Sequence, residues 1–230
     1  MNIILVGASG KMGRAIYDIN KKNVKIIAGV DLIKNEKMQQ NYQKFKEIPQ
    51  KIINNCDILL DFSNPEVIYD ELLFCKKYKI PLVICSTGHT NEQLNLINEA
   101  SKAVPIFKTN NTSWGVYIVV RILRQFSKYF SNYDINIIEK HHRLKKDSPS
   151  GTAVMLKDAI TENNKNINIL SVRGGTVVGE HEILFCGEHE YISIKHVAED
   201  RKLFAYGAIK ICEYMRHAKI AKLYSFDDLF

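Results

Sequence analysis

The sequence predicts an α/β fold, in which a smaller α+β domain is inserted into a parallel-sheet domain with helices on both faces. Three observations indicate this fold. Apolar, strand-like runs alternate with helical segments up to about residue 110, which is typical of a parallel sheet. Several strand-like segments then follow one another, which favours a largely antiparallel sheet with helices on one face. A last helical segment has no obvious partner nearby, so we expect it to return to the first domain.

The first domain is expected to contain five strands with helices between them. Apolar runs place these strands at 3–6, 25–30, 57–62, 81–86 and 104–107. One helix should run from about Lys11 to Asn20, and another should begin near Pro65, since proline suits the first turn of a helix. Thr90 and Gln93 have the spacing of a capping box, so a further helix is expected to begin there.

The second domain should begin with a long apolar helix over about 114–130, followed by a strand over 134–141. A loop and a helix from about Gly151 come next. Further strands are expected at 167–172, 177–185 and 190–197, before the final helix over about 204–216. We therefore assign residues 1–112 plus 202–230 to the first domain and residues 113–201 to the second.

Composition excludes several classes of protein. Apolar residues make up 46% and charged residues 25% of the 230 residues, which is ordinary for a globular protein and not for a disordered one. No apolar run approaches the length of a membrane span. The apolar N-terminal stretch has no basic segment before it, so we expect a buried strand and not a signal peptide. The five scattered cysteines are expected to be reduced thiols of a cytoplasmic protein.

The net charge of +7 raises the question of nucleic-acid binding. Lysines are spread along the whole chain and form no basic stripe, so we expect no nucleic-acid partner. A positive field equally suits anionic small molecules, because it steers them towards a cleft.

A glycine-rich turn over 7–13, with the sequence Gly-Ala-Ser-Gly-Lys-Met-Gly, separates the first strand from the first helix. Glycine lets the backbone approach a pyrophosphate closely, and the following helix start supplies backbone N–H groups. Asp31 ends the next strand, where a carboxylate can accept hydrogen bonds from ribose hydroxyls. The pattern predicts a Rossmann-type dinucleotide site. The acidic Asp31 disfavours a 2′-phosphate and so favours NADH, whereas Lys11 and Lys34 leave NADPH open.

The second group of candidate residues is the basic segment 139–153, which lies between a strand and a helix. Its histidines, lysines and helix start would form a good receptor for a dianion, and histidine also passes protons near neutral pH. His141 and His142 can both line one site only if the strand ends there. A solvated basic loop with an N-cap at Ser150 is the alternative interpretation.

A zinc site is a weaker interpretation of the histidines and cysteines in this half of the chain. Adjacent histidines make awkward co-ligands, and no paired spacing of the usual kind is present. We therefore expect no metal. The residues considered for it are His141, His142, His181, Cys186 and His189.

The segment 139–153, E-K-H-H-R-x-K-K-D-S-P-S-G-T-A, closely resembles the signature of the 4-hydroxy-tetrahydrodipicolinate reductases (dihydrodipicolinate reductases) of bacterial lysine biosynthesis. Further matches to this family occur in the same order along the chain. They are the motifs at 7–14, 61–66, 86–88, 111–115, 171–175 and 178–181.

The resemblance implies reduction of dehydrated 4-hydroxy-tetrahydrodipicolinate to tetrahydrodipicolinate by NAD(P)H. It implies that His141 donates and accepts protons and that Lys145 is a second catalytic group that binds a carboxylate. His142, Gly151 and Thr152 would hold the dicarboxylate substrate. The resemblance also implies a homotetramer in which the sheets of the second domains pack together.

For the cofactor, the resemblance implies binding by four segments of the first domain. The residues are Gly7, Ala8, Ser9, Gly10, Lys11, Met12, Asp31, Cys85, Ser86, Thr87, Thr109, Asn110, Asn111 and Thr112.

The chain departs from the family pattern at several places. Cys85 stands where glycine is usual and Thr112 where an aromatic residue is common, both next to the expected nicotinamide pocket. Leu32 replaces the arginine that follows the acidic residue in members that use NADPH well, which favours NADH. A glycine- and arginine-rich loop before the strand at 167–172 is also missing.

Two further hypotheses remain at this point. A dehydrogenase of similar build that acts on an amino or imino acid would need the glycine turn but not the whole basic segment. A regulator that senses NAD(H) without turnover would be expected to lack His141 or Lys145, and both are present.

Overall fold

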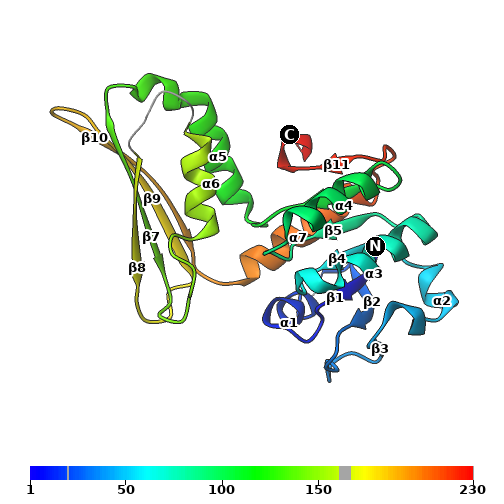
Figure 1. Cartoon of the computed structure of the whole chain (residues 1–230). Helices are drawn as coiled ribbons and strands as arrows, with labels where there is room; N and C mark the ends of the chain where they lie inside the picture. Colours follow the sequence, from blue (N-terminus) through cyan, green and yellow to red (C-terminus); the bar gives the residue numbers. More distant parts are fainter. Residues whose placement is uncertain (20, 161–166, 230) are drawn as a thin grey trace. The chain divides into compact units, whose positions relative to one another are not determined.

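The computed structural model describes residues 1–19, 21–160 and 167–229. The chain divides into two compact units (Figure 1), unit 1 comprising Met1–Thr112 with Phe204–Phe230, and unit 2 comprising Ser113–Leu203. The described part of the chain contains no helix that is long and apolar enough to cross a membrane.

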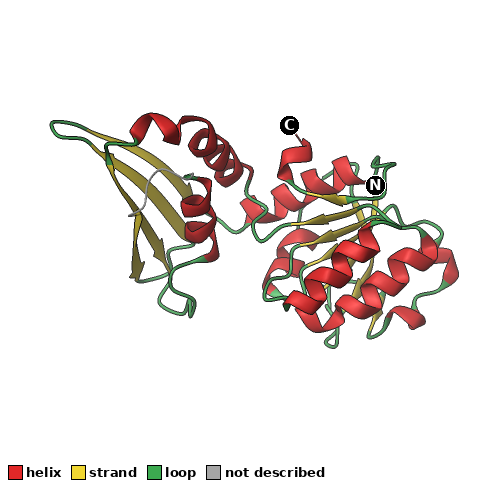
Figure 2. Ribbon diagram, turned by 45° about the horizontal axis from the view of Figure 1, so that its top comes forward, coloured by secondary structure: helices red, strands yellow, loops and turns green. Residues whose placement is uncertain are grey.

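Unit 1 is built on a seven-stranded sheet in the order β11-β6-β5-β4-β1-β2-β3, and all its pairings are parallel. Helices cover both faces of this sheet (Figure 2). The central strands are fully buried runs of Ile, Leu and Val, as expected where both faces are covered. The strands are β1 (Asn2–Val6), β2 (Lys25–Val30), β3 (Asn41–Tyr42), β4 (Ile58–Asp61), β5 (Leu82–Ile84), β6 (Ile106–Lys108) and β11 (Leu223–Tyr224).

The helices expected in the first domain are present in unit 1, in the expected order. The capping box is present, with Thr90 N–H donating to Gln93 Oε1 at 2.9 Å and Gln93 N–H donating to Thr90 Oγ1 at 3.2 Å. The first helix ends at Tyr17, and the predicted end at Asn20 lies outside the described residues. The helices are α1 (Lys11–Tyr17), α2 (Gln50–Ile53), α3 (Ile68–Tyr78), α4 (Asn91–Ser101) and α7 (Lys202–Met215), with short 3₁₀ turns η1 (Phe45–Glu47), η2 (Pro65–Val67) and η4 (Phe226–Leu229).

Unit 2 is a four-stranded sheet in the order β10-β9-β7-β8, with two helices packed on one face (Figure 1). Two pairings are antiparallel, as the sequence predicts, but β7 and β8 are parallel because α6 returns the chain between them. The predicted helix 114–130 is α5 up to Phe126 and a 3₁₀ turn after it. The elements are α5 (Trp114–Phe126), η3 (Ser127–Phe130), β7 (Asp134–His141), α6 (Gly151–Ala159), β8 (Ile167–Arg173), β9 (Gly179–Cys186) and β10 (Tyr191–Ala198).

The strand β7 alternates between a buried and a partly exposed face. Ile135 and Ile137 belong to the apolar core under α5 and α6. Because side chains alternate along a strand, Glu139 and His141 continue the same buried row beyond this core. The inward row therefore changes from apolar to ionisable residues at the end of the strand.

Candidate active site

The predicted nucleotide-binding segments all follow strands at one edge of the unit 1 sheet. The glycine turn follows β1, Asp31 follows β2, residues 85–87 follow β5 and residues 109–112 follow β6. Since all these strands are parallel, their carboxyl ends meet at the same edge. Open α/β sheets bind ligands at this edge.

The glycine turn has no room for side chains at two positions. Gly7 has φ +74°, and a Cβ there would lie 2.6 Å from the carbonyl oxygen of Phe62. A Cβ on Gly13 would lie 2.2 Å from the carbonyl oxygen of Gly7, because the first turn of α1 packs directly on the glycine turn. Such a turn lets the backbone approach a pyrophosphate.

Asp31 lies beside this turn. Its Oδ2 accepts a hydrogen bond from the Ser9 backbone N–H at 3.0 Å, and its Oδ1 accepts one from the Ile33 N–H at 3.3 Å. The carboxylate is therefore held where an acidic residue meets the ribose hydroxyls of a dinucleotide. The residues present fit the phosphate and ribose parts of NAD(P)H.

Other predicted side chains at this edge face the protein interior. The Ser86 hydroxyl donates to the fully buried carboxylate of Asp61, for which sequence reasoning assigned no role. Cys85 is buried, and burial raises the pKa of its thiol. The Thr112 hydroxyl donates to the carbonyl oxygen of Phe204 at 2.7 Å. At these positions the backbone, and not the side chain, is left to contact a nucleotide.

In unit 2, His141 is the last residue of β7 and forms a buried pair with Glu139. The imidazole Nδ1 hydrogen-bonds a carboxylate oxygen of Glu139, which is completely buried, while His141 is 8% exposed. A Cβ on Gly179 would lie 3.3 Å from His141 Nε2, so glycine there leaves the space beside this nitrogen clear. Nδ1 is therefore engaged, whereas Nε2 has no hydrogen-bond partner within the described residues.

Arg173, the last residue of β8, neutralises the buried carboxylate. Its Nη1 donates to Glu139 Oε2 at 2.9 Å and its Nη2 to Glu139 Oε1 at 2.6 Å, a bidentate arrangement. Burial opposes the charge of Glu139, but hydrogen bonds from Arg173, Ser171 and His141 outweigh it and lower the pKa of Glu139 to about 2. Glu139 is therefore ionised at neutral pH.

Two buried imidazoles of this site, those of His141 and His181, have lowered pKa values. Burial lowers the pKa of His141, and the Lys145 and Arg173 charges add to this, against the opposing effect of Glu139. His181 from β9 lies beside it, with ring centroids 5.1 Å apart, and burial lowers the pKa of His181 to about 4. His181 Nε2 is 3.1 Å from the Ser150 hydroxyl, so it contacts the start of α6.

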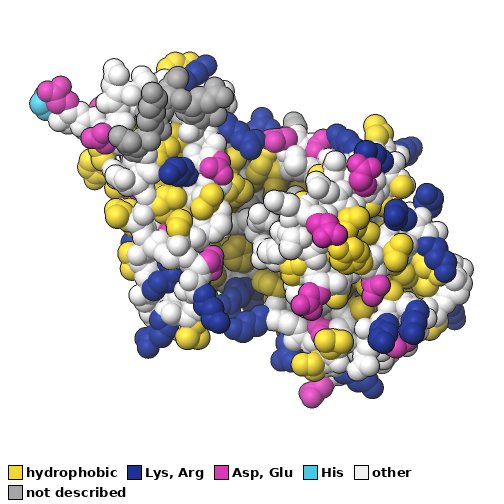
Figure 3. All heavy atoms as spheres, viewed as in Figure 1, with side chains coloured by type: hydrophobic (Ala, Val, Ile, Leu, Met, Phe, Trp, Pro, Cys, Tyr) yellow, Lys and Arg dark blue, Asp and Glu magenta, His cyan; other side chains and the backbone are white. Residues whose placement is uncertain are grey.

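The loop after β7 carries the other predicted residues to the same edge. β7 ends at His141, as both histidines require for a common site, and the Lys145 N–H donates to the His142 carbonyl oxygen at 3.1 Å. Lys145 Nζ lies 2.8 Å from a carboxylate oxygen of Asp147. Lys and Arg side chains gather over this end of unit 2, the lower end in Figure 3.

The helix α6 begins beside this loop. Ser150 is its N-cap and accepts a hydrogen bond from the Ala153 N–H at 3.2 Å. Gly151 and Thr152 occupy the first two helical positions, and the first N–H groups of a helix have no acceptor within it. A Cβ on Gly151 would have no atom within 4 Å, so a ligand carboxylate has access to the helix start.

The sequence pointed to the local residues of this site but gave no role to Glu139 or Arg173, and it raised His181 only as a candidate zinc ligand. All three lie in segments that carry the family resemblance, at 139–153, 171–175 and 178–181. In the described part of the chain, no group of three or more His, Cys, Asp or Glu residues could hold a metal ion.

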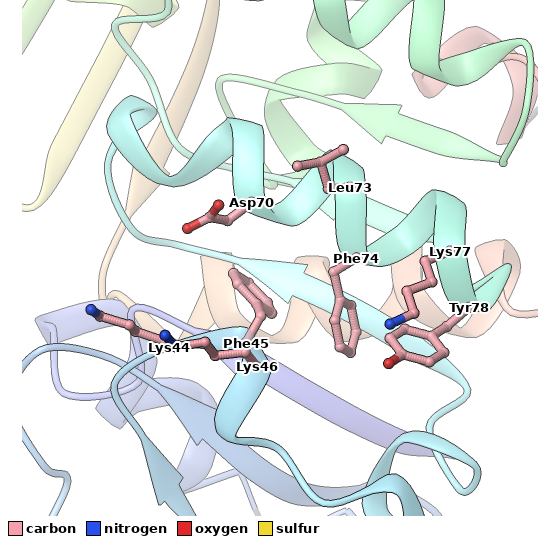
Figure 4. A pocket seen from close by; sticks show the side chains of 8 residues that line it. All are labelled: Lys44, Phe45, Lys46, Asp70, Leu73, Phe74, Lys77 and Tyr78. Carbon is pink, nitrogen blue, oxygen red and sulfur yellow. The ribbon is translucent and has the colours of Figure 1, made fainter.

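A separate hollow of about 410 Å³ lies on unit 1 between η1 and α3 (Figure 4). The rings of Phe45, Phe74 and Tyr78 form its apolar floor, and Lys77 Nζ lies 4.9 Å from the centre of the Tyr78 ring. None of the predicted site residues lines this hollow. We assign no function to it.

A Rossmann-type sheet unit with a separate mixed-sheet unit that presents a histidine–carboxylate pair is the build expected of an NAD(P)H-dependent oxidoreductase. Two family models match the chain: dihydrodipicolinate reductase, N-terminus, over residues 1–112, and dihydrodipicolinate reductase, C-terminus, over residues 115–230. The chain therefore belongs to the dihydrodipicolinate reductase family.

Curated relatives match over nearly the whole chain. A 4-hydroxy-tetrahydrodipicolinate reductase of Clostridium tetani is 40% identical over 99% of this chain and 96% of that protein. A protein of the same name from Clostridium novyi is 42% identical over 99% of this chain and 97% of that protein.

Solved structures share the fold. A dipicolinate-bound dihydrodipicolinate reductase from Paenisporosarcina has a TM-score of 0.84 at 22% identity, covering 100% of this chain and 99% of that one. A C. glutamicum DAP dehydrogenase in complex with DAP has a TM-score of 0.62 at 10% identity, covering 98% and 92%. At these identities the similarity indicates the fold alone.

Proposed function

We propose that this chain reduces dehydrated 4-hydroxy-tetrahydrodipicolinate to tetrahydrodipicolinate in diaminopimelate and lysine biosynthesis, with NADH as the preferred reductant. The observation that carries the proposal is the arrangement at the end of β7. There, His141 is held through Nδ1 by a buried carboxylate, beside Lys145 and the exposed start of α6. This arrangement combines a proton donor with two positive binding elements suited to a dicarboxylate.

The residues of unit 2 would then transfer protons and bind the two substrate carboxylates. His141 passes a proton through Nε2, which has no hydrogen-bond partner within the described residues. The Lys145 ammonium binds one substrate carboxylate and can donate a proton to the reduced ring. His142 and the α6 start, Gly151 and Thr152, hold the other carboxylate. A positioned acid or base of this kind contributes about 10²- to 10⁴-fold to a rate.

The residues of unit 1 would hold the reductant, which supplies the hydride when bound. Backbone groups of Gly7–Met12 hold the pyrophosphate, and the segments Cys85–Thr87 and Thr109–Thr112 contact the nicotinamide half. Asp31 accepts hydrogen bonds from the adenosine ribose. Leu32, which is 78% exposed immediately after Asp31, offers no cation to a 2′-phosphate, and this supports NADH over NADPH.

The same proposal includes the assembly and location of the protein. Residues 1–112 plus 202–230 bind the nucleotide, and residues 113–201 bind substrate and form a homotetramer in the cytoplasm. The unit 2 sheet supports this assembly, because its outer strands expose Leu170, Val172 and Val197 at 53%, 47% and 48%. Exposed apolar patches often mark protein–protein contacts.

A coupled assay tests the proposed function. Aspartate semialdehyde and pyruvate are converted by the preceding synthase, this protein is added with NADH or NADPH, and loss of nicotinamide absorbance is followed. We expect oxidation that requires every component, with a higher kcat/KM for NADH. Absence of oxidation with both nucleotides would contradict the proposed reaction, and a higher kcat/KM for NADPH would contradict only the cofactor preference.

A further inference from the structure

The hydrogen bond between Glu139 and His141 determines which imidazole nitrogen can act. Glu139 lies two residues before His141 on the same face of β7, so its carboxylate reaches Nδ1 from within the same strand. An ionised carboxylate only accepts hydrogen bonds. The proton of a neutral His141 is therefore on Nδ1, and the lone pair is on Nε2, next to the clear space at Gly179.

Arg173 holds this carboxylate from the neighbouring strand. The parallel register of β7 and β8 places Arg173 directly opposite His141. Two donors to the two carboxylate oxygens fix both the position and the plane of the Glu139 side chain. Arg173 Nη2 also donates to the Asp147 carbonyl oxygen at 2.7 Å, so the same guanidinium is tied to the loop that carries Lys145.

Glu139 also contacts the start of α6. The Ser150 backbone N–H donates to Glu139 Oε1 at 3.2 Å, immediately before the first helical residue. One buried carboxylate thus contacts the catalytic imidazole, the guanidinium and the N-cap of the helix proposed to bind substrate. A displacement of Glu139 would disturb all three.

We propose that Glu139 is a positioning residue for the reaction: clamped by Arg173, it holds His141 in the Nδ1–H tautomer and presents Nε2 to the substrate. This inference rests on the proposed function, since it assumes that His141 passes the proton. Nothing in the role of Glu139 requires contact with substrate, because it acts through His141.

The charged groups around His141 determine how loss of the Glu139 charge would change the pKa of His141. His141 faces Glu139 on its own strand, Arg173 on β8, His181 on β9 and Lys145 in the following loop. Among these groups Glu139 carries the negative charge that raises the pKa of His141, whereas burial, Lys145 and Arg173 lower it. Neutralising Glu139 should therefore lower the pKa of His141 and remove its protonated form at a lower pH.

The kinetic test compares Glu139→Gln with Glu180→Gln. Glu180 is the matched control, because it lies on the opposite face of the same sheet edge, where it pairs with Lys140 at 2.6 Å and Lys195 at 2.9 Å. We expect E139Q to lower kcat about 100-fold and to move the alkaline limb of kcat/KM down by about one pH unit. NADH affinity should stay within about twofold, since the nucleotide cradle lies in unit 1, and E180Q should resemble the wild type.

A spectroscopic test measures the tautomer of His141 in the wild-type protein, so it does not depend on whether a Glu139 variant folds. In ¹⁵N-histidine-labelled wild-type protein, with the His141 signal assigned by its loss in His141→Gln, we expect the neutral Nδ1–H tautomer. The Nε2–H tautomer would overturn the proposal, as would an E139Q variant whose kcat and pH profile match those of E180Q. If the wild type oxidises neither NADH nor NADPH in the coupled assay, the proposed function fails instead, and the tautomer still decides whether Glu139 orients His141.

Discussion

The two candidate sites of this chain differ in the groups that form them. At the sheet edge of unit 1, the site is mainly backbone: Gly7 and Gly13 exclude side chains, and Asp31 is the main polar side chain beside them. At the end of β7 in unit 2, the site is a network of charged side chains, with Glu139 joined to His141 and Arg173.

The two sites should therefore tolerate different substitutions. In unit 1, Cys85 and Thr112 stand where the family resemblance leads us to expect glycine and an aromatic residue. Their side chains are buried in the protein, so the backbone can keep its path. In unit 2, loss of one charge leaves a buried partner unpaired, which is costly. Steric changes should damage the first site, and charge changes should damage the second.

The largest expected effect on nucleotide binding is steric and falls on the glycine turn of unit 1. In Gly13→Ala, the new Cβ would lie 2.2 Å from the carbonyl oxygen of Gly7, so the turn must move. We expect NADH binding, measured by fluorescence titration, to weaken by about 100-fold, since overpacking of this kind costs up to about 3 kcal/mol. Gly174→Ala is the control, because its Cβ would meet no atom within 4 Å. Equal affinities in the two variants would contradict the close packing of α1 on the turn.

The next largest effect is expected from a change of charge in unit 2. Lys145→Ala removes the ammonium proposed to bind a substrate carboxylate, and we expect kcat/KM for the dicarboxylate to fall about 100-fold, with NADH binding retained. Lys146→Ala, one position along and exposed, is the matched control and should change kcat/KM by less than about threefold. Steady-state kinetics in the coupled assay measure both. Similar losses in the two variants would indicate a general field effect and not a specific contact.

The buried imidazole of His181 should make unit 2 sensitive to acid. Its pKa is lowered from 6.5 to about 4 by burial, so protonation favours the unfolded state. The contribution to stability is therefore complete above about pH 6.5 and is lost as the pH falls towards 4. Between about pH 7 and about pH 5 this costs about 2 kcal/mol.

Urea unfolding followed by the fluorescence of Trp114, the single tryptophan, measures this loss in unit 2. His181→Gln should flatten the dependence on pH, because glutamine can still contact Ser150 but does not titrate. The exposed His189, with 90% of its side chain accessible, provides the control variant His189→Gln, which should keep the wild-type slope. An unchanged slope in His181→Gln would show that another group causes the acid sensitivity.

The smallest expected effect concerns the choice of nucleotide. Leu32→Arg places a cation beside Asp31, at a position that is 78% exposed, and should raise kcat/KM for NADPH about tenfold through a charge-assisted contact with the 2′-phosphate. Ile33→Arg adds the same charge one residue later, at 69% exposure, and should give a smaller gain. Equal gains would mean that net charge, and not the residue after Asp31, sets the preference.

The sequence predicted the buried parallel strands and the glycine turn because both leave local patterns. It did not predict β3 or β11, which have two residues each and are too short to show a period. In unit 2 it singled out His141, Lys145 and the start of α6 as candidate site residues, because they are neighbours in one segment, and their roles stay predictions. The role of Arg173 could not be seen, because it depends on the parallel register of β7 and β8, whereas the pattern favoured antiparallel pairing.

One variant in each site separates nucleotide binding from proton transfer. Asp31→Ala and His141→Gln are compared for NADH affinity by titration and for kcat with saturating NADH and dicarboxylate. We expect D31A to weaken NADH binding about tenfold with kcat nearly unchanged, because a hydrogen bond to a charged group contributes about 1.5–3 kcal/mol. We expect H141Q to lower kcat about 10²- to 10⁴-fold with NADH affinity nearly unchanged. A normal kcat in H141Q, or NADH affinity lost in H141Q and kept in D31A, would contradict the division of function between the two sites.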